Sequence, residues 1–235
     1  MEALIDTDIV CYRIAFACKE ESLSLARSRL DKAITDILLA VDHDSHFYDS
    51  WRLFLTGSNN FRHDVAVSFP YKGNRTAPKP DHLKGLRAHA VKEWNAIVCE
   101  GEEADDAIGI ASATQIDSCI IASIDKDLDQ LQGWHYNFNK KLHYYVDQAA
   151  AERFFYKQLL TGDTTDNIIG LRGIGNVKAL KLLTEAVTEK EMYDVCVAEY
   201  ADRDLDEARV LENARLLWLR RHKEQMWLPP EELYA

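Results

Sequence analysis

The chain has 235 residues, of which 47% are apolar and 29% are charged, a balance typical of a globular protein that can bury a sizeable core. Its apolar runs are shorter than the roughly 20 residues that a membrane-spanning helix needs. The first residues lead directly into a strand-like run, so the sequence predicts neither membrane insertion nor secretion. Five cysteines lie scattered without C-x-x-C spacing, which is typical of reduced thiols in an intracellular protein.

The formal net charge of −11 argues at first sight against a nucleic-acid partner. Eight acids of the clusters described below account for much of this excess, since without them 28 basic residues face 31 of the 39 acidic ones. Cations bound among those eight acids would leave a nearly balanced surface. The global charge therefore does not decide the class of partner, and local patches must.

The first predicted element is a short buried strand, Ala3–Ile5, which ends at Asp6 and leads into a helix over Cys11–Lys19. Ligands of open α/β sheets bind outside the carboxyl ends of the strands, so Asp6 lies where a site would form. Asp6 and Asp8 could equally cap the next helix. The sequence leaves both interpretations open at this point.

A helix over Ser24–Val41 and a second strand over Trp51–Thr56 come next. The segment that follows is basic, and it contains Tyr71, Lys72 and Arg75. In a helical turn the two basic residues would share a face and could hold a phosphate, while the tyrosine ring could stack on a base. A solvated basic surface is the simpler alternative. Beyond this segment, the proline-broken residues 76–80 are expected to form a mobile loop or short arch.

The densest acidic cluster, Gly101–Gly109, contains Glu102, Glu103, Asp105 and Asp106. It follows a predicted helix over His82–Glu93 and a strand over Ala96–Cys99, and it opens a helix over Asp105–Ala113. Acids in a first turn stabilise a helix without any metal, so capping is the rival explanation. Four neighbouring acids repel one another unless cations or protons compensate, which favours a metal site.

A further acidic pair, Asp125 and Asp127, follows the β-branched run Cys119–Ile124, with a salt-bridged turn as the alternative interpretation. Shorter strands are predicted over Tyr136–Phe138 and Leu142–Val146. The alternation of strands and helices up to about residue 150 indicates an α/β fold with a mostly parallel sheet flanked by helices.

From residue 147 the pattern changes to helices and turns. A helix over Phe154–Leu160 leads into a turn that carries Asp163 and Asp166, and an amphipathic run over Val177–Leu183 follows a Gly-Ile-Gly turn. Two helices joined by such a turn can bind phosphates through backbone amides without reading sequence. Two more helices are predicted over Glu189–His222, followed by a docked tail at Trp227–Pro230.

Several motifs occur in a fixed order: L-I-D-T-D, N-F-R, Y-K-G-N-R, G-E-E-A-D-D, S-I-D-K-D-L-D-Q-L and L-T-G-D-T-T-D-N-I-I-G-L-R-G-I-G. Together they resemble the 5′-nuclease superfamily, which includes flap endonucleases, the 5′-nuclease domains of bacterial DNA polymerases and phage 5′–3′ exonucleases. The compact length resembles the phage exonucleases most. The resemblance implies a PIN-like nuclease core over residues 1–150, then a helix–three-turn–helix DNA-binding element and C-terminal helices over residues 151–235.

The resemblance also implies roles for particular residues. Lys72 and Arg75 match a basic pair that contacts the scissile phosphate. The residues that match metal ligands are Asp6, Glu103, Asp105, Asp106, Asp125, Asp127, Asp163 and Asp166. The residues that match DNA contacts are Arg62, Tyr71, Gly170, Gly173, Gly175, Asn176 and Lys178.

One position departs from the family pattern, because Thr56 stands where many relatives have an aspartate. Either Asp8 or water replaces that carboxylate, or the first metal binds more weakly. The segment between Arg75 and Glu103 is also short, so a full helical arch is not expected.

The implied activity is that of a structure-dependent 5′–3′ exonuclease and 5′-flap endonuclease. It would use two Mg²⁺ or Mn²⁺ ions, with K⁺ at the helix–three-turn–helix element. Its partner would be DNA with a 5′ end or flap, or an RNA·DNA hybrid, and no membrane. The expected form is a monomer in the cytoplasm of a bacterium or phage-infected host. The alternatives are a catalytically weakened DNA-binding protein and a PIN-like ribonuclease.

Overall fold

The computed structural model describes residues 1–41 and 50–230. Its contacts divide the chain into two units. Unit 1 comprises Met1–Asn60, Ala77–Val146 and Arg221–Lys223, and unit 2 comprises Phe61–Thr76, Asp147–Arg220 and Glu224–Ala235. The predicted boundary near residue 150 lies close to the change at Val146, but the prediction placed the basic segment Phe61–Thr76 in the first domain. The last five residues of the predicted second domain, 231–235, lie outside the described residues.

Unit 1 contains a six-stranded sheet with the order β3-β2-β1-β4-β5-β6. Strands β1 to β5 pair in parallel, and β6 runs antiparallel to β5. The predicted mostly parallel sheet is therefore confirmed. The strands are β1 (Glu2–Asp6), β2 (Trp51–Thr56), β3 (Ile97–Cys99), β4 (Cys119–Ala122), β5 (Gly133–Asn137) and β6 (Leu142–Val146).

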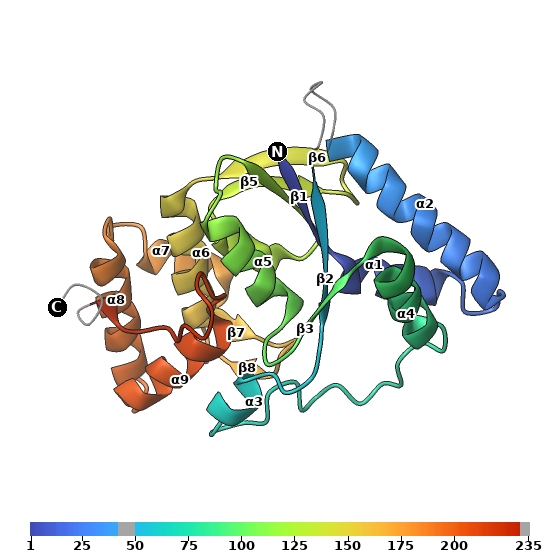
Figure 1. Ribbon diagram of the computed structural model, residues 1–235. Helices are drawn as coiled ribbons and strands as arrows, with labels where there is room; N and C mark the ends of the chain where they lie inside the picture. Colours follow the sequence, from blue (N-terminus) through green and yellow to red (C-terminus); the bar gives the residue numbers. More distant parts are fainter. Residues whose placement is uncertain (42–49, 231–235) are drawn as a thin grey trace. The chain divides into compact units, whose positions relative to one another are not determined.

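Helices cover both faces of this sheet. On one face α1 (Thr7–Ala17), α2 (Leu23–Val41) and α4 (Leu83–Trp94) contact one another, and they bury a core with Ile5, Leu30 and Leu55. On the other face α5 (Ala104–Ala113) packs across β1, β2, β3 and β4 (Figure 1). Because both faces are covered, the middle residues of β1, β2 and β4 are apolar and buried, as is usual in parallel strands.

Two helices of unit 1 begin earlier than the sequence predicts. Helix α1 starts at Thr7 rather than Cys11, because the Asp6 carboxylate accepts the amide N–H of Ile9 at 3.3 Å and caps the first turn. Helix α5 starts at Ala104 for a similar reason, since Glu103 is its N-cap. The acids at the strand ends therefore do serve as caps, which was the rival interpretation of these clusters.

Unit 2 is mainly helical. It contains α3 (Arg62–Val65), α6 (Gln148–Thr161), α7 (Asn176–Leu182), α8 (Glu189–Ala201) and α9 (Glu207–Leu217), with a short hairpin of β7 (Gly162–Asp163) and β8 (Ile168–Ile169). Tyr156 and Tyr200 are buried in its core, and Trp227 of the tail packs against Phe155 and Tyr193 with ring centroids 5.8 and 5.6 Å apart.

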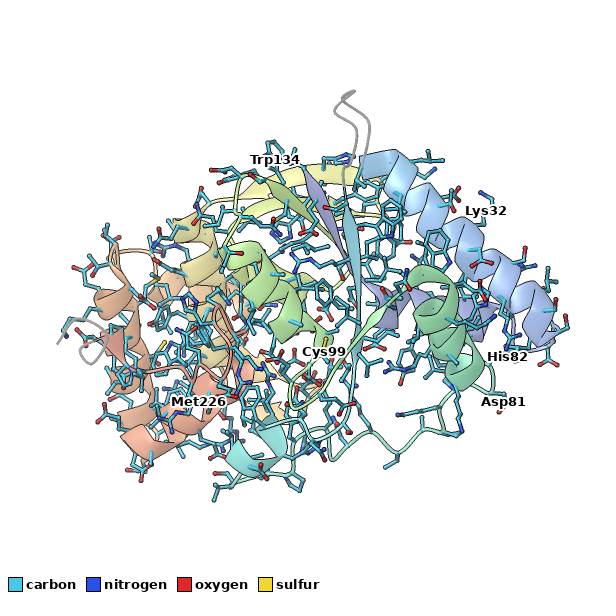
Figure 2. The ribbon with its side chains drawn as sticks, viewed as in Figure 1. Lys32, Asp81, His82, Cys99, Trp134 and Met226 are labelled. Atoms are coloured by element: carbon cyan, nitrogen blue, oxygen red, sulfur yellow. The ribbon has the colours of Figure 1, made fainter. Side chains whose placement is uncertain are left out.

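The described helices include none that is both long and apolar enough to cross a membrane. Aromatic rings pair between β5 and β6 at the antiparallel edge of this sheet: Trp134 of β5, which Figure 2 labels, lies edge-on to Tyr145 of β6.

Candidate active site

The carboxyl ends of β1 and β4 bring two of the predicted metal ligands together in unit 1. These strands are parallel neighbours, so Asp6 at the end of β1 lies beside the turn that leaves β4. Ser123 joins the two acids: its hydroxyl donates to Asp6 Oδ2 at 2.8 Å and accepts the amide N–H of Asp125 at 3.0 Å. The Asp125 carboxylate in turn accepts the amide of Asp127 at 2.9 Å and caps the 3₁₀ turn Lys126–Gln130.

The environment of Asp6 disfavours its charged form. Asp6 is 4% exposed, and this burial, together with the negative charge of Asp125, raises the pKa of Asp6 to about 6. The hydrogen bonds from Ser123 and the Ile9 amide act in the opposite direction. A buried carboxylate beside a second carboxylate is an arrangement that a bound cation would stabilise.

Two of the acids in the first turn of α5 have structural partners. Glu103 and Asp106 form a capping box, in which each side chain accepts the backbone N–H of the other. Asp106 is completely buried. The acidic cluster also affects the neighbouring Cys99. Burial, and then the charge of Glu102, raise the pKa of the Cys99 thiol to about 11, and the charges of Asp105 and Asp106 raise it further. Figure 2 labels Cys99 at the end of β3.

Among the residues that the structure describes, no three Asp, Glu, His or Cys side chains gather into a group that could hold a metal ion. The donor chemistry in unit 1 nevertheless fits magnesium or manganese. These ions prefer hard oxygen ligands, and Mg²⁺ is usually held by only one or two protein carboxylates together with waters and substrate phosphates. Asp6 and Asp125, linked through Ser123, provide such a pair.

Unit 2 places Asp166 against the predicted basic pair. Its carboxylate accepts Arg75 Nη2 at 2.6 Å and the hydroxyl of Tyr71 at 2.7 Å, and Lys72 Nζ lies 3.6 Å away. Asp163, which is 8% exposed, accepts the backbone N–H groups of Thr165 and Asp166 at 2.6 and 3.4 Å. Both acids of the G-D-T-T-D-N motif therefore shape one turn.

The segment that carries the basic pair forms a turn. Lys72 has a φ of 54°, in the left-handed region, and its amide N–H donates to the carbonyl of Asp166 at 2.8 Å. Asn74 Nδ2 donates to Thr164 O at 2.6 Å, which ties the segment to the same hairpin. Lys72 and Arg75 thus lie on the same carboxylate through contacts with a distant part of the chain.

Two predicted DNA contacts are buried. Arg62 is 1% exposed and donates to the carbonyls of Leu216 and Trp218 at 2.8 and 3.0 Å. Tyr71 is 4% exposed, with its ring edge-on to His63 and its hydroxyl on Asp166. These positions give both side chains a structural role.

The glycine-rich turn has a different character. Gly173, with a φ of +78°, and Gly175 have open space where a Cβ would be, whereas a Cβ on Gly170 would collide with the Thr161 carbonyl. Gly175, Asn176 and Lys178 are exposed. An open backbone turn at the start of α7 suits the close approach of a phosphate backbone.

The sequence interpretation missed Arg87 and Ser123. Arg87 of α4 donates to the Asp8 carboxylate and to the Thr56 carbonyl. Asp8 also accepts the amide N–H of Thr56 at 2.6 Å. These contacts occupy Asp8, so the alternative in which Asp8 replaces the aspartate absent at position 56 is not supported. Ser123 could have been noticed because it follows β4 at the same edge as Asp6.

No family model matches the chain. Among the curated relatives, DNA polymerase I of Rhizobium leguminosarum is 34% identical over 156 residues, covering 57% of this chain and 14% of the polymerase. Flap endonuclease Xni of Shewanella sp. (strain W3-18-1) is 30% identical over 183 residues, covering 70% of this chain and 66% of the relative. The chain thus spans less than two thirds of the length of these relatives.

The fold is similar to that of a solved bacteriophage T5 flap endonuclease, described as a pseudo-enzyme–product complex with DNA and metal ions. The TM-score is 0.64 at 16% identity, with 92% of this chain and 88% of the phage chain covered. The names of these relatives agree with the superfamily that the ordered motifs predicted. The predicted resemblance to the 5′-nuclease superfamily is therefore confirmed.

Proposed function

We propose that this protein hydrolyses phosphodiester bonds of DNA as a 5′–3′ exonuclease and 5′-flap endonuclease that requires divalent metal ions. The observation that carries the proposal is the Asp6–Ser123–Asp125 arrangement at the carboxyl ends of two parallel strands. Ligands of open α/β sheets bind at this edge, and the name of the Shewanella relative, a flap endonuclease, supplies the reaction class.

The chain's own residues would divide the work as follows. Asp6, Glu103 and Asp105, together with Asp125 and Asp127, would hold a first Mg²⁺ or Mn²⁺, and Asp163 and Asp166 would hold a second ion. Such ions lower the pKa of the attacking water and neutralise charge on the phosphate. Asp106 is predicted to bind metal as well, and its side chain accepts the backbone N–H of Glu103 in the capping box.

Lys72 and Arg75 stabilise the negative charge that develops on the scissile phosphate. In the absence of substrate both lie on Asp166, so a phosphate that approaches this turn would compete with a carboxylate for the same two cations. The planar guanidinium of Arg75 suits bidentate binding, whereas Lys72 acts as a point charge.

Binding of the duplex would use the glycine-rich turn. This turn has an exposed backbone and one positively charged side chain, and its residues are Gly173, Gly175, Asn176 and Lys178. Such a surface suits contacts to phosphates, which carry no sequence information. K⁺ at this turn, action on RNA·DNA hybrids, a monomeric state and a bacterial or phage-infected host are parts of the same proposal.

The test uses 5′-labelled duplex, 5′-flap DNA and an RNA·DNA hybrid, each incubated with protein and Mg²⁺ or Mn²⁺, and in parallel with EDTA. We expect cleavage that EDTA abolishes: a ladder of short products indicates exonuclease action, and a single cut at the junction indicates flap cleavage. Asp125→Ala should remove turnover while it leaves DNA binding intact, and Asp64→Asn, an exposed acid of α3, serves as the control. Binding without cleavage by the wild type would identify a DNA-binding protein instead, and cleavage of RNA alone would identify a ribonuclease.

A further inference from the structure

Thr56, at the carboxyl end of β2, connects the two helices that carry the predicted ligands of the first metal. Its amide N–H donates at 2.6 Å to the carboxylate of Asp8 in the first turn of α1. Its hydroxyl accepts at 3.0 Å the N–H of Ala104, the first residue of α5. One residue of the sheet therefore holds the start of both helices.

Each helix start is next to a predicted metal ligand. Asp6 is the N-cap of α1, two positions before Asp8, and Asp105 follows Ala104 in the first turn of α5. The N–H of Ala104 is one of the amides that the helix itself cannot satisfy, and within the described contacts the Thr56 hydroxyl accepts it. Thr56 therefore contacts the first turn of α1 and the first turn of α5, and each of these turns lies next to a predicted ligand.

Arg87 of α4 contacts both Asp8 and Thr56. It donates to the Asp8 carboxylate and to the Thr56 carbonyl, so it clamps the same two residues that the Thr56 amide joins. The side chains of Arg87 and Asp8 are only 26% and 17% exposed. A guanidinium presents its donors in a rigid plane, which makes the pair a geometric constraint as well as an ion pair. The Arg87 guanidinium also occupies the Asp8 carboxylate, so the other acids are left to bind the metal ion.

We propose that Thr56 is a positioning residue for the metal site, held by the Asp8–Arg87 pair, and that its hydroxyl sets the direction of the first turn of α5. The inference rests on the proposed function, because it concerns the ligands of the proposed metal site. Residues that orient ligands without touching the metal typically contribute about 10–100-fold to metal affinity or activity.

The test compares Thr56→Val, Thr56→Ser and the wild type. Valine has the same shape and keeps the backbone contacts with Asp8 and Arg87, so this change removes only the acceptor for Ala104. Thr114→Val is the matched control: Thr114 is exposed, and its hydroxyl donates to Ala111 O at 3.2 Å at the other end of α5. Binding of Mn²⁺ to protein without DNA is measured by electron paramagnetic resonance, and thermal unfolding is recorded in parallel.

We expect Thr56→Val to weaken Mn²⁺ binding about tenfold, Thr56→Ser to restore it to within about twofold, and Thr114→Val to leave it unchanged. The Mn²⁺ concentration for half-maximal cleavage should rise by the same factor in Thr56→Val, with the KM for DNA unaltered. Unchanged Mn²⁺ affinity in Thr56→Val, or a serine variant as weak as the valine variant, would overturn the inference. A wild-type protein that binds no Mn²⁺ would instead refute the proposed function, so the two failures are distinguishable.

Discussion

Arg62 offers a direct test of a structural role against a DNA-binding role. Its guanidinium donates at 2.8 and 3.0 Å to the carbonyls of Leu216 and Trp218, at the end of α9. The last carbonyls of a helix lack partners within the helix, and a cation is favoured at this end. Arg62 therefore acts as a C-terminal cap that comes from a distant part of the chain.

The magnitude follows from these two contacts. Hydrogen bonds to a charged group contribute about 1.5–3 kcal/mol each, and Arg62 is only 1% exposed, so solvent does not screen them. Arg62→Met keeps most of the apolar stem and leaves both carbonyls without this donor. We expect the free energy of unfolding to fall by about 3–5 kcal/mol. With a urea m-value of about 2 kcal/mol/M, the unfolding midpoint should fall by roughly 2 M.

The assay is urea unfolding monitored by tryptophan fluorescence, since Trp227 is buried in the same unit. Arg172→Met, at an exposed position of unit 2, is the matched control and should shift the midpoint little. DNA binding of Arg62→Met, measured where the variant is folded, should keep the wild-type dependence on salt. A loss of less than about 1 kcal/mol, together with a salt slope smaller by about 1, would show that Arg62 contacts phosphate instead.

Three further changes probe the site and the sheet. Lys72→Ala should lower kcat by about 100-fold or more with little change in KM, and an equal loss in DNA affinity would contradict a role in the chemistry. A double-mutant cycle of Asp166→Asn with Arg75→Gln should give a coupling of about 0.5–1 kcal/mol, because Arg75 is 49% exposed and solvent weakens the pair; a coupling near zero would show that the pair does not contribute to stability. Burial lowers the pKa of His135 from its ordinary value of 6.5, so the unfolded chain takes up a proton first and stability should decrease as the pH falls below about 6.5. His135→Gln should flatten this decrease in unfolding curves measured between pH 7 and 5, and an unaltered slope would exclude His135 as its source.

The sheet could be predicted because its strands are apolar runs with clear ends. The predicted strands Trp51–Thr56 and Leu142–Val146 have the bounds that the structure shows. Strand β5 was predicted only from Tyr136 onward, but it starts at Gly133, since β4 and β6 pair with it on both sides. Its Gly-Trp-His beginning has no strand-like pattern, so tertiary pairing alone extends it.

Helix starts were harder to predict, because the residue that caps a helix lies outside its apolar pattern. The apolar pattern of α6 suggested a helix from Phe154, yet the helix starts at Gln148 after Asp147 caps it by accepting the N–H of Ala150 at 2.8 Å. The same effect lengthened α1, where Asp6 is both the end of a strand and a cap. For an acid at such a junction the sequence predicts either a metal ligand or a helix cap, and the structure shows the cap.

Some hydrogen-bond partners of the candidate site could not be predicted from the sequence, and the reason is physical. The order of the strands brings Asp6 beside Asp125, and this could be inferred from their positions at the ends of parallel strands. The contact of Arg87 with Asp8 and Thr56 depends on which face of α4 packs toward α1, and helical periodicity does not distinguish a half-buried arginine from a solvated one. A neutral residue at position 56 therefore looked like a missing ligand. In the folded chain its hydroxyl accepts an amide that α5 cannot satisfy, and its backbone joins an ion pair, so the position constrains the neighbouring carboxylates without contributing a charge of its own.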